Sequence, residues 1–116
     1  DRVMLVIGSD FGRTNFYNDG QGKDHWPIGS YMIMEKNAPW GNRVVGQTDA
    51  LHFAQRIDPR TLKESRDGVL ITPAHVHQAI QEYLGLNRYA HDLGFGLRDT
   101  VSLPLFDPSV QTGAPA

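Results

Sequence analysis

Apolar residues form an unbroken run near the start of the chain, at residues 3–7. The run does not alternate with polar positions, which is typical of a strand covered on both faces in a parallel α/β sheet. Shorter apolar stretches at residues 30–34 and 43–45, separated by turn-forming residues, predict a second and a third strand. The first half of the chain is therefore expected to consist of strands and loops.

The clearest helix is predicted at about residues 73–84. Thr72 is expected to be its N-cap and Pro73 its first helical residue, and Gly85 is expected to end it. The apolar positions between these signals recur at helical spacing and form one face: Val76, Ala79, Ile80, Tyr83 and Leu84. Residues 88–116 contain three prolines and are expected to form an extended tail, so the chain divides into segments 1–87 and 88–116.

Chemically active side chains follow the first strand. Asp10 and Arg13 come directly after it, and Asp24 and His25 follow a loop rich in Gly, Asn and Asp at residues 15–22. Ligands of α/β sheets collect at the carboxyl ends of strands, where this segment is expected to lie. Carboxylates and imidazoles are ligands of zinc and similar divalent ions. The pattern indicates a metal site with Asp10, Asp24 and His25 as candidate ligands.

Each candidate has a structural alternative. Asp10 is equally suited to an Asx-turn or a helix N-cap. Asp24 and His25 are neighbours and point in different directions on an extended chain, so Asp24 either binds the ion or orients an imidazole. His25 has the further alternative of being packed and hydrogen-bonded to a carbonyl. Arg13 suits two oxygens of a phosphate or sulfate, or a salt bridge to Asp10 or Asp19.

Composition narrows the function classes. The 116 residues carry 11 Lys and Arg against 13 Asp and Glu, a formal net charge of -2, so no basic stripe favours nucleic acid as a partner. No stretch approaches the roughly 20 apolar residues that span a bilayer. Cysteine is absent, which excludes thiolate nucleophiles and Cys-rich zinc sites. A buried strand starting within two residues of Asp1 needs neighbours, which indicates a fragment of a longer polypeptide.

Three ordered motifs resemble one known family. They are SDFGRT at residues 9–14, GKDHWP at 22–27 and VGQTD at 45–49. Together they resemble the C-terminal part of a bacterial, sulfatase-like family of unknown function in the alkaline phosphatase superfamily, over about residues 2–87. The resemblance implies an α/β fold, part of an alkaline phosphatase-like sandwich with a mostly parallel sheet flanked by helices, incomplete in this fragment. It also implies a periplasmic or extracellular location.

The resemblance implies a function as well. The chain is expected to be the C-terminal segment of a metal-dependent hydrolase of phosphate or sulfate esters, inactive alone, with Asp10, Asp24 and His25 binding zinc, manganese or calcium. Arg13 is expected to steer the anion of a small-molecule or glycan ester. The superfamily's nucleophile and first metal-binding aspartates lie in the N-terminal remainder, and Phe11 stands where the superfamily has a histidine.

Two further interpretations stay open. The chain could be a binding protein for an anion or a sulfated or phosphorylated glycan, without catalysis. A bound metal could also be purely structural and tie the Gly-rich loop to the sheet.

Overall fold

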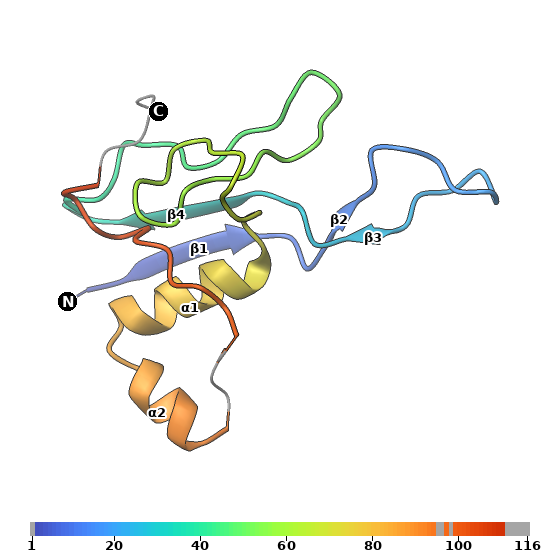
Figure 1. Cartoon of the computed structure of the whole chain (residues 1–116). Coiled ribbons are helices and arrows are strands. Elements are labelled where there is room, and N and C mark those ends of the chain that lie inside the picture. Colours follow the sequence, from blue (N-terminus) through green and yellow to red (C-terminus); the bar gives the residue numbers. More distant parts are fainter. Residues whose placement is uncertain (1, 95–96, 98, 111–116) are drawn as a thin grey trace.

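The computed structural model of the chain describes residues 2–94, 97 and 99–110 (Figure 1). Its regular structure consists of short strands followed by helices. In chain order these are β1 (Met4–Gly8), β2 (Gly12–Arg13), β3 (His25–Trp26), β4 (Tyr31–Glu35), α1 (Pro73–Tyr83) and α2 (Asn87–Asp92). No helix of the described residues is long and apolar enough to cross a membrane.

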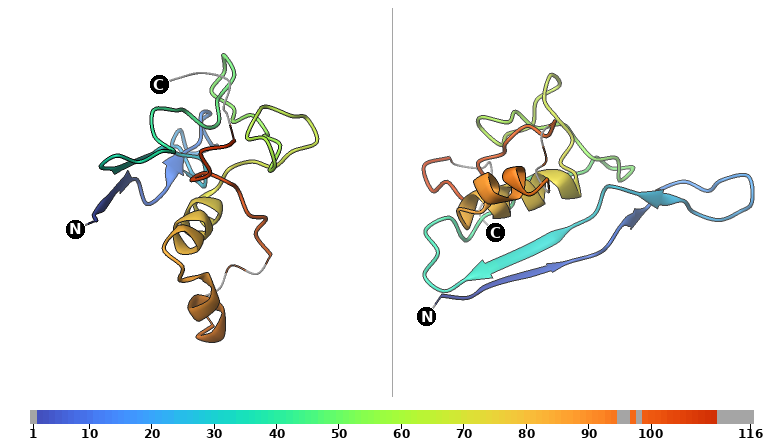
Figure 2. Two further views of the ribbon diagram at one scale, coloured as in Figure 1. Left: turned by 90° about the vertical axis from the view of Figure 1, so that its left-hand side faces the viewer. Right: turned by 90° about the horizontal axis from the view of Figure 1, so that it is seen from below.

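The four strands form one long antiparallel hairpin with an interruption in the middle. β1 pairs with β4 from Met4 opposite Glu35 to Gly8 opposite Tyr31, and β2 pairs with β3. The β2–β3 end projects away from the rest of the molecule (Figures 1 and 2). A Cβ at Gly12 would lie 1.7 Å from the carbonyl oxygen of Ile28, so only glycine lets the two arms approach this closely where the hairpin bends.

The expected mostly parallel sheet is wrong for this chain. Every strand pairing in the described part is antiparallel, in two sheets of two strands each, so the fold is not an alkaline phosphatase-like sandwich. Leu5 and Ile7 of β1 are about half exposed, at 51% and 50%, where burial on both faces was expected. The apolar run correctly indicated a strand, but an apolar pattern does not specify the direction of the neighbouring strand.

The other expected strands had different outcomes. The second, at 30–34, is confirmed as β4. The third, at 43–45, is wrong, because only an isolated bridge forms there. The Arg43 side chain instead donates hydrogen bonds to the carbonyl oxygens of Leu105, Asp107 and Val110, and so holds the later segment against the molecule.

The core lies among loops rather than against the sheet. Ile57, Leu62 and Leu103 are 1–3% exposed and pack with partly buried residues of the same region: Val45, Val69, Ile71, Leu105 and Val110. Ile57 and Val69 exchange both backbone hydrogen bonds, at 2.9 and 2.8 Å. A Cβ at Gly68 would lie 1.9 Å from the carbonyl oxygen of Ile57, so this crossing also requires glycine.

Helix α1 begins and ends close to the predicted residues. Thr72 is the N-cap and Pro73 starts the helix, and its buried residues, Val76 and Ala79, belong to the predicted stripe. A histidine completes the capping box, because the Thr72 amide donates to Nδ1 of His75 at 3.0 Å and the Thr72 side chain accepts from the His75 amide. Burial lowers the pKa of His75, so the neutral ring that accepts this bond is favoured.

Helix α1 covers one face of the β1–β4 sheet. The Tyr83 hydroxyl donates to the Glu35 carboxylate, and Arg2 bonds both groups. These two partners, Tyr83 first, lower the pKa of Glu35, whose side chain is only 9% exposed. At the other end of the sheet Tyr31 meets His77 edge to face, with ring centroids 6.4 Å apart. The sheet and helix thus form two layers (Figure 2).

The segment expected to be an extended tail differs in two places. Helix α2 begins at Asn87, and residues 102–110 return to the core, where Phe106 packs on Trp40 and Tyr83 with centroids 4.9 and 4.8 Å apart. Residues 95, 96, 98 and 111–116 lie outside the described part of the chain. The division of the chain at residue 87 stays a prediction.

Candidate functional site

The β2–β3 hairpin carries three of the four predicted site residues. Arg13 and His25 are direct partners across the two strands, so their side chains rise from the same face. The His25 ring stacks on Phe11 with centroids 3.7 Å apart and 19° between the planes. The Arg13 guanidinium lies over the same Phe11 ring, 5.2 Å from its centroid. Phe11, Arg13 and His25 therefore form one exposed cluster.

The Arg13 guanidinium is held by its own hairpin. Its Nη1 donates to the Lys23 carbonyl at 2.9 Å, and no ion pair with Asp10 or Asp19 is present among the described residues. The salt-bridge alternative is thus not what the structure shows. A guanidinium has five N–H donors in a planar fork, so the remaining donors are available to an anion.

Asp24 is fixed on the loop side of the hairpin. Its Oδ1 accepts a hydrogen bond from Asn18 Nδ2 at 2.9 Å, and Asn18 Oδ1 accepts from the amides of Gly20 and Gly22. The Asp24 backbone pairs with Thr14, which is 7% exposed. Because successive strand residues point to opposite faces, Asp24 and His25 diverge, as the sequence predicted.

Asp10 stands outside this arrangement. Its carboxylate is exposed and has neither a hydrogen bond nor an ion pair within the described part of the chain, so the Asx-turn alternative is not observed either. No three His, Asp, Glu or Cys side chains of the described residues form a group that could hold a metal ion. The structure brings Arg13 and His25 together and leaves Asp10 and Asp24 outside a common ligand group.

The third sequence motif positions the hairpin. Asp49 Oδ1 accepts hydrogen bonds from the amides of Leu51 and Phe53, which shapes a tight loop. The Phe53 ring of this loop packs edge to face on Trp26 of β3, with ring centroids 6.3 Å apart. The Leu51 carbonyl accepts a hydrogen bond from Asn15 Nδ2 at 2.7 Å. The motif thus ties the projecting hairpin to the rest of the molecule.

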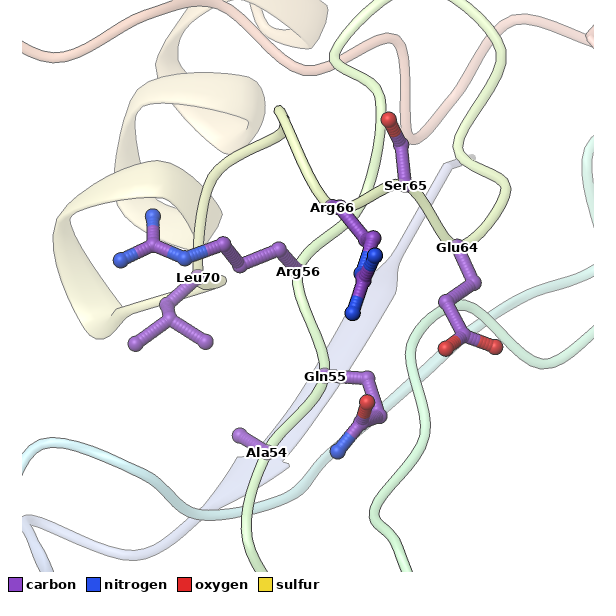
Figure 3. Close-up of a pocket in the computed structure, with 7 residues that line it drawn as sticks. All are labelled: Ala54, Gln55, Arg56, Glu64, Ser65, Arg66 and Leu70. Carbon is purple, nitrogen blue, oxygen red and sulfur yellow. The ribbon is translucent and has the colours of Figure 1, made fainter.

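A concavity of about 370 Å³ lies in the loop region 54–70, away from every predicted site residue (Figure 3). Arg56 is fixed there, because its Nη1 donates to the Gly68 carbonyl at 3.2 Å, and Glu64 accepts from the Gln47 side chain. The Arg66 side chain points toward Gln55 (Figure 3) and has no hydrogen bond or ion pair within the described part. The sequence carries no signal for this concavity, because Arg56 and Arg66 lie ten residues apart in a polar stretch without a motif.

Comparisons with known proteins place the sequence in a family. No curated protein and no solved structure matches the chain. One family, described as "Protein of unknown function (DUF1501)", matches residues 1–90, which include the four strands, the core residues Ile57 and Leu62 and helix α1. Because this match covers most of the 116 residues, the chain belongs to the DUF1501 family.

Proposed function

We propose that the chain is part of a metal-dependent hydrolase of phosphate or sulfate esters, to which it contributes His25 and the anion-binding Arg13. The observation that carries the proposal is the direct pairing of Arg13 with His25 across β2 and β3. This pairing places a possible metal ligand beside a guanidinium that can grip two oxygens of an ester anion. The resemblance of the three motifs to a sulfatase-like family supports the same assignment.

The imidazole of His25 favours zinc or manganese over calcium, because calcium prefers oxygen ligands alone. Bound in such a site, the metal would lower the pKa of the attacking group and stabilise charge on the ester oxygens. Within this chain, Phe11 holds the His25 ring on the face of the hairpin that also carries Arg13.

The site requires a second part. Asp10, Asp24 and His25 do not form a ligand group among the described residues. We therefore assign the nucleophile and the remaining metal ligands to the N-terminal remainder of a longer, exported polypeptide, and we expect this chain alone to be inactive. Its substrates would be small-molecule or glycan esters of phosphate or sulfate.

Arg13→Lys in the longer polypeptide tests the role of the guanidinium. Lysine keeps the charge and loses the planar fork, so KM for an ester that the parent protein hydrolyses should rise about tenfold or more. Arg88→Lys, on the exposed surface of α2, is the matched control and should leave KM unchanged. Equal kinetics for both variants, or no ester hydrolysis by the parent protein, would contradict the assignment.

The concavity at Arg56 and Arg66 favours a second candidate, anion binding without catalysis. Arg66 is the cation there without a hydrogen bond or ion pair in the described structure, and its side chain points toward the uncharged hydrogen-bonding group of Gln55 (Figure 3). Titration with inorganic sulfate and phosphate, followed by amide chemical shifts, tests this function. Arg66→Gln should abolish shifts at residues 54–70, whereas Arg88→Gln should not.

A further inference from the structure

We propose that the outward face of the β1–β4 sheet is the surface on which the remainder of the same polypeptide packs through an apolar surface of its own. This inference rests on the proposed function, because it gives the missing half of the site a place to dock. The proposal concerns the β1–β4 sheet and not the β2–β3 hairpin, which carries Arg13 and His25.

One face of the β1–β4 sheet is apolar throughout and uncovered. The register places Leu5 opposite Met34 and Ile7 opposite Met32, so these four side chains share one face. Val3, just before β1, continues the alternation on that face. The exposed fractions are 74% for Val3, 51% for Leu5, 50% for Ile7, 58% for Met32 and 41% for Met34.

The opposite face of the β1–β4 sheet packs against helix α1. Tyr31 and Glu35 lie on that face and contact α1 through His77 and Tyr83. Viewed from below, the helices and loops all lie on one side of the ribbon, and the other side is bare (Figure 2). A sheet with two apolar faces needs a layer on each, and one is supplied here.

The outer edge of β1 is a second unsatisfied feature of the same surface. Within the described residues β1 pairs with β4 alone, so alternate N–H and C=O groups of residues 4–8 have no ladder partner. An edge strand this apolar, without a charged side chain between residues 3 and 8, is open to pairing with a further strand. The incoming segment thus meets an apolar face and an open edge together.

The size of the patch favours a covalently linked occupant over a second copy. Five side chains at these exposures present roughly 500 Å² of surface, near the upper end for the largest patch on a monomer. Two copies meeting through it would bury about 1,000 Å² in total, the lower limit for a specific complex. A linked segment is held at about millimolar effective concentration, so the same contact suffices for it.

Amide hydrogen exchange tests the proposal on unaltered protein. In the 116-residue chain alone, the amides of β1 that point to the open edge should exchange rapidly, and the face should bind a hydrophobic dye. In the parent polypeptide the same amides should exchange at least 100-fold more slowly, and the dye signal of this face should be lost. Equal exchange and equal dye binding in the two proteins would overturn the inference.

Leu5→Glu adds a test by substitution. In the 116-residue chain the side chain is already half exposed, so Tm should change little. In the parent polypeptide the same substitution places a charge in the contact and should lower Tm by several degrees. Leu93→Glu, at a leucine 70% exposed beyond α2, is the control and should be mild in both proteins. A mild effect of Leu5→Glu in both would count against docking at this face.

The outcomes separate docking from hydrolysis. Slowed β1 exchange in a parent protein that binds no metal would retain the docking surface and remove the proposed function. Metal binding and turnover without slowed β1 exchange would retain the proposed function and remove the docking surface. Concentration-dependent dimers of the 116-residue chain that themselves slow β1 exchange would identify a second copy as the occupant and overturn the inference.

Discussion

The loop core around Ile57 and the β2–β3 hairpin are stabilised in different ways. The core buries Ile57, Leu62 and Leu103 almost completely and closes around a backbone crossing at Gly68. The hairpin exposes its aromatic and charged side chains and depends on local hydrogen bonds, with Thr14 as its buried residue in the described structure. The loop core is therefore stabilised by burial of its own side chains, whereas the β2–β3 hairpin is a projecting element that exposes the candidate site residues.

The largest expected effect comes from emptying the core. Ile57→Ala should lower the free energy of unfolding by about 4 kcal/mol, because it removes a side chain 1% exposed and leaves a cavity. Ile7→Ala, on the open face of β1, is the matched control and should cost less than about 1 kcal/mol. Urea denaturation of both variants measures the difference. Equal losses would show that the sheet is as well packed as the core.

Gly68→Ala should come next, at about 3 kcal/mol. The new Cβ would lie 1.9 Å from the Ile57 carbonyl oxygen and 2.9 Å from the Asp58 nitrogen, so the crossing has to open. Gly20→Ala in the hairpin loop is the control, since its nearest contact is 3.4 Å and an effect within about 0.5 kcal/mol is expected. Thermal unfolding of the two variants makes the comparison, and a large effect at Gly20 would contradict it.

Within the hairpin, Asn18→Ala should have a local effect of about 1 kcal/mol. The substitution removes the acceptor for two glycine amides and the donor to Asp24, all in an exposed loop. Amide exchange at Gly20 and Gly22 should accelerate while exchange in the core stays unchanged. Asn18→Asp retains the acceptor for the two amides but loses the donor to Asp24 and repels its carboxylate, so Gly20 and Gly22 should be protected better than in Asn18→Ala and less than in the unaltered chain. Acceleration throughout the molecule would show that the hairpin and the core unfold together.

The smallest expected effect is a dependence of stability on pH through His75. Burial lowers its pKa in the folded chain, so the unfolded chain binds more protons below about pH 6.5. The contribution of His75 to the free energy of unfolding should therefore be fully present above that pH and be lost as the pH drops through the lowered pKa. His75→Gln keeps an acceptor for the Thr72 amide and should remove the step. A stability curve with the same step in both proteins would assign it to another group.

The elements that could be predicted from the sequence are those that depend on residues close together in the chain. Strands β1 and β4 and helix α1 follow from short apolar runs and capping residues, whose effects act within a few residues. The pairing of β1 depends on a neighbour outside its own pattern, so its antiparallel direction could not be predicted. The stretch at 43–45 forms only an isolated bridge, and its Arg43 side chain bonds carbonyls more than 60 residues later, a contact that no local pattern indicates.

The candidate site shows the same difference between features set by nearby residues and features set by how a long loop folds. The structure pairs Arg13 with His25 in the segment that the motif spacing indicates, and the divergence of Asp24 from His25 follows from strand geometry. The functional role of these residues stays a prediction. The convergence of Asp10 with Asp24 depended on how a long loop folds, and the structure does not form it. Phe11, which stands where the resemblance places a histidine, instead packs on His25.

The metal content of the proposed longer polypeptide tests the central claim most directly. Elemental mass spectrometry of the purified protein should find about one or two equivalents of zinc or manganese. His25→Ala should reduce that content, and His77→Ala, at an exposed histidine on α1, should not. A folded parent protein without metal after supplementation, or with a content unaffected by His25→Ala, would contradict the metal-dependent hydrolase.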